Sequence, residues 1–284
     1  MERIIKTLTP TALVVAGAVV FVLGTAFLLA SDATLSTSPG ASGDLAQAGR
    51  WLQFLAVVCV LGAVCTAGWD AILRSEWVAA AEIAAAALGA LLLTIGLAAF
   101  AASNGSSPAA PVTGAVGIGV WALLVLSRAA RTSLAEQGPA YGAAQEARST
   151  LPGAGSRGRQ ADLWLSAAIG LFALAIGYGF TAAAGSTGPG IAAGLLEAVG
   201  IGALAGSVAV ARSRQMLSSR PVLGVLTGLA LLAISFLAYA IVAGLALRTL
   251  TALAAGLTVV TAVELAAVVA LGLAAWTRVR ELYR

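Results

Sequence analysis

Three glutamates interrupt long apolar runs, and they are the residues of this sequence with the clearest capacity for chemistry. Glu82, Glu197 and Glu264 each lie among Ala, Leu, Val and Gly residues. A charge at mid-bilayer costs at least a few kcal/mol, so acidic residues in such runs face protein or water and mark proton or cation sites. The alternative is a neutral carboxyl group that serves only as a hydrogen-bonding link between helices.

The three glutamates differ in their expected depth. Glu264 lies near the middle of its run and shares a helical face with Thr258 and Thr261, which gives a polar stripe. Glu197 lies about two turns from the outer end of its run, and Glu82 lies about one turn from the cytoplasmic end, where it can reach the headgroups. The partners expected from neighbouring runs are Tyr178, Ser235 and Tyr239.

The sequence lacks the usual ligands of metals and haem. It contains no histidine, which excludes imidazole ligation and histidine general bases. Cys59 and Cys65 are six residues apart, a spacing that suits neither a disulfide nor a shared ion on a straight helix. No Asp-rich, H-E-x-x-H or nucleophile–base motif is present. We therefore predict no metal site, no cofactor, no catalytic residue and no enzymatic activity.

The composition predicts an all-α membrane protein. Hydrophobic residues make up 60% of the 284 residues and charged residues only 10%, whereas soluble domains are about one quarter charged. Apolar runs of the length needed to cross a bilayer recur along the chain. We predict a single polytopic bundle of about eight transmembrane helices over residues 1–284. The predicted spans are 11–30, 51–69, 78–101, 112–127, 163–183, 190–211, 222–246 and 253–276.

The placement of basic residues predicts the orientation. With these spans, fourteen of the 16 Lys and Arg residues fall on one side, and only Arg50 and Arg248 fall on the other. The positive-inside rule makes the side with fourteen basic residues cytoplasmic. Both termini are therefore expected on the cytoplasmic side of the cell inner membrane. The first run is longer than a signal-peptide core, so we expect a retained helix. Residues 31–50 form a flexible external loop and residues 128–162 a cytoplasmic loop in this scheme.

Glycines at four-residue spacing predict close helix packing. Such pairs place two glycines on one helix face, where another backbone can approach. We expect the sixth and seventh spans to form a tight pair. A weak repeat also links AVGIGVWALLVLSRAAR from Ala115 to AVGIGALAGSVAVARSR from Ala198, which indicates stacked hairpins. The paired glycines are Gly190 and Gly194, Gly202 and Gly206, and Gly224 and Gly228.

Several segments resemble the copper-resistance D (CopD) family of eight-helix membrane proteins. They are ARSRQMLSSRPVLGVLTGLALL, VELAAVVALGLAAWTRVREL, AGRWLQFLAVVCVLGAVC and GYGFTAAAGSTGPGIAAGLLEAVGIGALAG. The resemblance implies the same architecture and a role in handling copper at the inner membrane. The family's histidines near residues 179–182 and 196–197 are missing here, and Glu264 stands where the family has a basic residue. Glu197 is then expected to replace a ligand at an outward-facing polar site.

Two functional hypotheses follow. In the first, the protein is a CopD-like permease or metal-handling protein that uses Glu197 and Glu264 in its interior. In the second, it is a cofactor-free membrane anchor or assembly subunit of a larger complex, such as a respiratory or oxygenase complex. The expected partners are the lipid bilayer and either other membrane subunits or further copies of the chain. Nothing in the sequence indicates nucleic-acid binding.

Overall fold

A computed structural model describes the protein over residues 2–73, 77–103, 107–136, 160–181, 187–211, 220–245 and 249–282. The described residues form eight helices and no strand, and every helix is long and apolar enough to cross a membrane. The prediction of an eight-helix membrane bundle is therefore confirmed. The helices are α1 (Glu2–Thr34), α2 (Pro39–Leu73), α3 (Trp77–Ala102), α4 (Ala109–Glu136), α6 (Gln160–Phe180), α7 (Thr187–Ala211), α8 (Arg220–Gly244) and α9 (Leu250–Leu282).

The predicted flexible loop at residues 31–50 is wrong. Helix α1 continues to Thr34 and α2 begins at Pro39, so only a short turn separates them. The two helix ends are joined by Ser31, whose hydroxyl lies 2.9 Å from the Ser42 carbonyl oxygen and 3.1 Å from the Ser42 hydroxyl. The apolar run ends at Ala30, but the helix continues. The polar groups of the buried Ser31 and Ser42 find hydrogen-bonding partners in each other across the turn.

Helix α4 also runs beyond its predicted end. It continues from the apolar run to Glu136, so Arg128 and Arg131 lie on a helix and not in a loop. The rest of the predicted cytoplasmic loop, up to residue 159, lies outside the described residues. The extra turns place the two arginines beyond the end of the apolar run, where both still contact Glu82 of α3.

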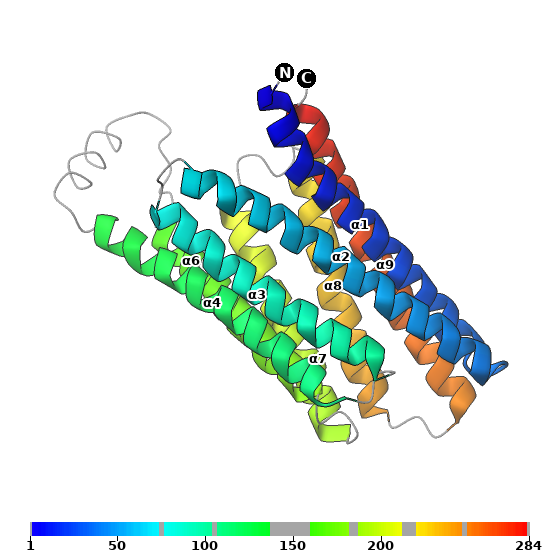
Figure 1. The fold of residues 1–284 in the computed structure, drawn as a ribbon. Helices are drawn as coiled ribbons and strands as arrows, with labels where there is room; N and C mark the ends of the chain where they lie inside the picture. The colour runs from blue at the N-terminus through cyan, green and yellow to red at the C-terminus, as the bar shows by residue number, and fades with distance from the viewer. Residues whose placement is uncertain are drawn as a thin grey trace.

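The helices close into a ring. Each described helix packs mainly against its neighbours in the sequence, in alternating directions, and α9 returns to pack against α1. Figure 1 shows α1 beside α9 and both chain termini at the same end of the bundle. We call this the terminal end, and the end that carries the turn between Thr34 and Pro39 the turn end. Helices from opposite ends of the chain therefore share one interior.

Reciprocal glycine contacts hold helix pairs together. A Cβ atom added to Gly24 of α1 would lie 2.9 Å from the Gly49 carbonyl oxygen of α2, and one added to Gly49 would lie 2.8 Å from the Gly24 carbonyl oxygen. Gly170 of α6 and Gly200 of α7 face each other in the same way, at 2.7 and 2.6 Å. Only glycine allows backbones to approach this closely.

The predicted glycine pairs have mixed outcomes. A Cβ atom on Gly194 would lie 2.7 Å from the Phe236 carbonyl oxygen, and one on Gly190 would lie 3.3 Å from the Ala243 Cβ, so this pair packs α7 against α8. The prediction that Gly202 and Gly206 pack a helix is wrong, because nothing lies within 4 Å of an added Cβ atom at either position. Gly224 and Gly228 pack against α9 rather than α7.

The weak sequence repeat has a counterpart in the packing. Its two copies align Gly117 of α4 with Gly200 of α7, and Gly119 with Gly202. A Cβ atom on either of the first two would lie 2.6 Å from a glycine carbonyl oxygen of the preceding helix, Gly89 or Gly170. A Cβ atom on Gly119 or Gly202 would meet nothing within 4 Å. The hairpins α3–α4 and α6–α7 are therefore built on the same contacts.

Candidate interior acidic site

A hydrogen bond between the first and last helices lies inside the ring. The hydroxyl of Thr261 on α9 donates to the Asp32 carboxylate on α1. Thr261 is only 7% exposed, although Asp32 lies just two residues before the end of α1. This contact joins two residues that are 229 positions apart in the sequence and fixes the depth of α1 against α9.

Two further carboxyl groups lie near Asp32. Glu264 follows Thr261 by one turn of α9 and is close enough to Asp32 for their charges to interact. Glu197 of α7 is 5% exposed, and its carboxyl group is in turn close enough to interact with that of Glu264. Asp32, Glu264 and Glu197 thus form a chain of acidic groups from three helices, which we call the interior acidic cluster.

Two tyrosines flank this cluster. Tyr178 of α6 and Tyr239 of α8 each lie within electrostatic range of Glu197. Both tyrosines lie within the last turns of their helices at the turn end. Glu197 lies ten residues into α7 and Glu264 fourteen residues into α9, counted from the same end. The cluster therefore extends from the turn end to about the middle of the bundle.

The other predicted partners make only local contacts. Thr258 donates to the Ala254 carbonyl oxygen of its own helix at 2.7 Å. Ser235, which is 1% exposed, donates to the Leu232 carbonyl oxygen of its own helix at 2.8 Å. Hydroxyl groups in membrane helices commonly satisfy themselves in this way. The structure thus brings together Glu197, Glu264, Thr261, Tyr178 and Tyr239, whereas Thr258 and Ser235 bond to their own helices.

Sequence reasoning missed Asp32. The hydropathy of the first run ended its span at Ala30, which placed Asp32 in an external loop. A signal for its true position exists at Thr25, seven residues earlier on the same face of α1, because two turns separate residues that point the same way. Thr25 is fully buried, and its hydroxyl donates to the Phe21 carbonyl oxygen at 3.0 Å.

The cluster does not have the geometry of a chelating metal site. Among the described residues, no three His, Cys, Asp or Glu side chains are grouped closely enough to hold a metal ion. Cys59 is half-buried and Cys65 is exposed, and both are free thiols. A chain of spaced carboxyl groups instead resembles the proton relays and cation paths for which intramembrane acids are generally used.

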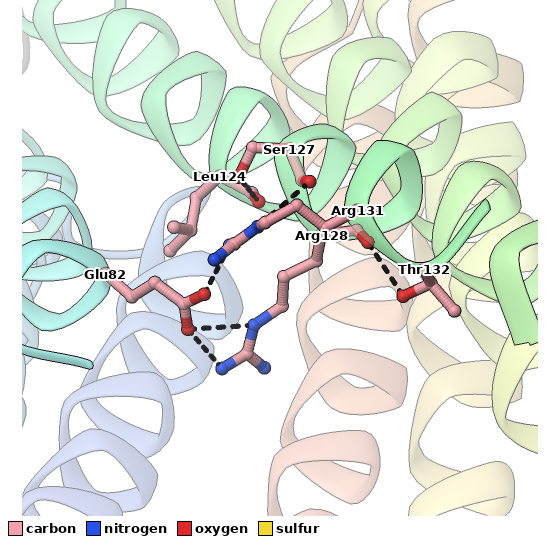
Figure 2. Close-up of polar contacts among 6 residues, drawn as sticks. All are labelled: Glu82, Leu124, Ser127, Arg128, Arg131 and Thr132. Carbon is pink, nitrogen blue, oxygen red and sulfur yellow. Dashed lines mark hydrogen bonds and ion pairs between the residues drawn. The ribbon is translucent and has the colours of Figure 1, made fainter. Parts of the chain in front are cut away.

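A second polar cluster lies toward the terminal end, between α3 and α4. Figure 2 shows Glu82 of α3 between Arg128 and Arg131 of α4, and both arginines form ion pairs with its carboxylate. The Arg128 Nε atom lies 3.0 Å from Glu82 Oε2, and its guanidinium lies 5.5 Å from the centre of the Trp164 ring on α6. Glu82 therefore pairs within the protein instead of reaching the lipid headgroups.

The glutamate–arginine cluster borders an open groove. The groove has a volume of about 410 Å³ and is lined by both apolar and polar side chains of α3 and α4. Glu82 carries one negative charge against two positive charges, so the cluster is net basic. The lining residues are Val78, Ala81, Glu82, Leu124, Ser127 and Arg131.

No family model, curated protein or solved structure matches this chain. The sequence and the geometry described above therefore provide the basis for a functional assignment.

Proposed function

We propose that this multi-pass membrane protein is a permease for protons or small monovalent cations. The observation that carries the proposal is the interior acidic cluster. Asp32, Glu197 and Glu264 come from the first, sixth and last of the eight helices, yet their carboxyl groups lie within electrostatic range along one chain. Acidic residues that only stabilise one helix pair do not need this convergence.

The electrostatics of the cluster favour binding of positive charge. Neighbouring carboxylates repel each other, and the repulsion is far stronger in the low-dielectric interior than in water. Leaving such charges uncompensated costs several kcal/mol. A bound proton or monovalent cation removes this cost, and its transfer from Asp32 to Glu264 moves it inward to the level that Glu264 shares with Glu197.

The location of the cluster gives the proposed path a direction. Because it begins within two residues of the end of α1, a cation enters from the turn end. The positive-inside rule places that end outside the cell, and we propose the cell inner membrane as the location. The net basic glutamate–arginine cluster lies toward the opposite end.

The resemblance to CopD proteins supports ion handling but not copper as the cargo. Copper prefers thiolate, thioether and imidazole ligands. The interior acidic cluster offers only carboxyl, hydroxyl and phenol oxygens, which suit protons and hard cations. We therefore propose a hard monovalent cargo for the same general architecture.

The test is transport by the purified full chain in proteoliposomes. A pH-sensitive dye inside the vesicles reports proton entry, and an isotope or a dye reports sodium and potassium entry. Wild type is expected to conduct one of these cations, and Glu264→Gln is expected to fold normally but abolish conduction, because an amide cannot take up a proton or balance a cation. Glu82→Gln is the matched control, since it makes the same chemical change outside the interior acidic cluster.

Two results contradict the proposal. One is the absence of any cation flux from wild-type vesicles that contain folded protein. The other is an equal flux from wild type and Glu264→Gln. In that case Glu264 is only a hydrogen-bonding link, and Glu264→Leu should then cost about 1 to 2 kcal/mol of stability while Gln costs little.

A membrane subunit of a larger complex is the second candidate function. It is favoured by the bare faces at Gly202 and Gly206, where no described residue approaches an added Cβ atom within 4 Å. Small residues on an open face allow a further helix to pack closely. Purification from native membranes distinguishes the candidates, because a subunit retains stoichiometric partners whereas a permease conducts cations in their absence.

A further inference from the structure

All four hairpins of the ring share one backbone contact. In each, a Cβ atom added to a glycine of the first helix would lie 2.7 to 3.0 Å from one carbonyl oxygen of the second helix. The repeat detected between α3–α4 and α6–α7 thus extends to α1–α2 and α8–α9. The contacting pairs are Gly17 with Ala56, Gly89 with Gly117, Gly170 with Gly200, and Gly228 with Ala267.

A second shared contact fixes the alignment. In the first three hairpins, a second glycine follows the first glycine by seven residues. A Cβ atom added to it would lie 2.7 to 3.0 Å from a carbonyl oxygen of the second helix, seven residues before the oxygen of the first contact. The fourth hairpin has Ser235 at this position, and Ser235 is 1% exposed. Two contacts with equal spacing in both helices define a register for the whole ring. The second contacts are Gly24 with Gly49, Gly96 with Ala110, and Gly177 with Ala193.

In this register, the buried Glu197 and the half-buried Glu264 of the second helices are equivalent. The position three residues before the first contact is Gln53 in α2, Gly114 in α4, Glu197 in α7 and Glu264 in α9. Glu197 and Glu264 belong to the interior acidic cluster, so the shared register assigns the same interior level to Gln53. Gln53 has no role in the site as described above.

The surroundings of Gln53 agree with this assignment. Its Nε2 atom lies 3.5 Å from the Thr25 hydroxyl, and Thr25 is fully buried on the face of α1 that carries Asp32. Thr25 follows Gly24 as Tyr178 follows Gly177, so these two residues are also equivalent. The pair Gln53 and Thr25 therefore repeats, in the first hairpin, the placement of Glu197 and Tyr178 in the third.

The second hairpin has a glycine, Gly114, at this position, and a side chain of the third hairpin occupies the space beside it. Gly114 has no side chain, and a Cβ atom added there would clash with the ring of Tyr178 on α6. The phenol thus occupies the place that a side chain of the second hairpin would otherwise take. The first, third and fourth hairpins thus have a polar side chain of their own at this level, and Tyr178 of the third hairpin occupies the place left by Gly114 in the second.

We propose that Gln53, Tyr178, Glu197 and Glu264 form one ring of oxygen ligands that selects the permeating cation, with Gln53 as its neutral, selectivity-setting member. This inference rests on the proposed permease function. Four oxygen-bearing groups with two ionisable carboxyls suit a proton or a small monovalent cation. Divalent cations such as Ca²⁺ prefer more carboxylates, so the amide of Gln53 disfavours them. The path lies within one chain and not between copies.

Transport by three variants in proteoliposomes tests the inference. Gln53→Leu should lower cation flux about tenfold, the usual loss when a hydrogen-bonding partner of a charged group is removed. Gln53→Glu should make the flux sensitive to block by millimolar Ca²⁺, because it adds a third carboxylate to the ring. Gln47→Leu is the matched control on the same helix, since the Gln47 amide donates to the Ala101 carbonyl oxygen of α3 at 2.8 Å, outside this register.

The outcomes separate the inference from the proposed function. Unchanged flux and unchanged Ca²⁺ block in both Gln53 variants, while Glu264→Gln abolishes flux, overturn the ring and leave the permease standing. Unchanged flux in Glu264→Gln overturns the permease. If Gln53→Leu fails to fold, the Ca²⁺ response of Gln53→Glu decides the question.

The geometry of the ring has a test that does not need transport. Gly114→Ala should lower the melting temperature by steric conflict with Tyr178. Tyr178→Ala should rescue this defect, in that Gly114→Ala lowers the melting temperature much less in a Tyr178→Ala protein than in wild type. Gly119→Ala is the control, because an added Cβ atom there meets nothing within 4 Å. A stable Gly114→Ala protein, or a lack of rescue, contradicts the placement of Tyr178 in the ring.

Discussion

Thr261 of α9 donates a hydrogen bond to Asp32 of α1, and this bond closes the ring of helices. The neighbouring hydroxyl of Thr258 bonds only to its own helix among the contacts described, at the Ala254 carbonyl oxygen. Thr261 also lies 3.0 Å from the Leu257 carbonyl oxygen of its own helix, so the two threonines differ in the bond to α1, and this difference can be measured.

Thr261→Val should lower the free energy of unfolding by about 1 kcal/mol, because the half-buried Asp32 carboxylate loses its donor on α9. Thr258→Val should change it by much less. Thermal unfolding of both variants in the same detergent measures the difference. Equal losses would show that the contact between α1 and α9 does not depend on this bond.

Gly194→Ala should destabilise the protein by about 1 to 3 kcal/mol, the usual cost of overpacking. Its added methyl group would meet backbone atoms of α8, at 2.7 Å from the Phe236 carbonyl oxygen. Gly202→Ala should be neutral or slightly stabilising, because the added methyl group meets open space and alanine favours helix. Melting temperatures of the two variants provide the measurement, and a reversed order would contradict the packing of α7 on α8.

A cysteine at Gly40 should react with a membrane-impermeant thiol reagent in intact cells. Gly40 is exposed near the turn end, which the positive-inside rule places outside. The background protein should carry Ala at Cys59 and Cys65. Leu134→Cys, at the other end of the bundle and 69% exposed, should react only after lysis. The opposite labelling pattern would invert the proposed orientation.

The purified protein should show no Soret band and should lose copper on dialysis against a mild chelator. The reason is the absence of histidine from the sequence, together with the oxygen-only chemistry of the interior acidic cluster. Absorption spectroscopy and metal analysis after dialysis give the result. Stoichiometric copper that survives dialysis would require a soft-ligand site, and Cys59 and Cys65 would be the first residues to examine.

Hydropathy predicted the eight helices because a charge inside a bilayer is costly, and the same cost made Glu197 and Glu264 stand out. It failed at Asp32, since a helix can continue past the last apolar residue when its polar groups find partners across a turn. Such partners, Thr261 above all, are far away in the sequence and are invisible to a local window. Gln53 escaped notice because an amide is a weaker signal than a carboxylate.

The glycine pattern was present in the sequence, but the four-residue spacing identified only part of the packing. Two of the three predicted pairs pack against a neighbouring helix, whereas a Cβ atom added to Gly202 or Gly206 would meet no described residue within 4 Å. The contacts that recur use glycines seven residues apart, at Gly17 and Gly24, Gly89 and Gly96, and Gly170 and Gly177. A seven-residue spacing of glycines identifies a contact only when the partner helix is known. The sequence alone does not show which helices pair, so this spacing could not be recognised from it.

The contact of α9 with α1 can form only late in biosynthesis. Helices enter the membrane in order, and α9 is synthesised after the other seven. Until it arrives, the nascent chain has neither Thr261 nor Glu264, and Asp32 has no donor from α9. The interior acidic cluster, which includes Glu264, is therefore complete only after α9 has been made.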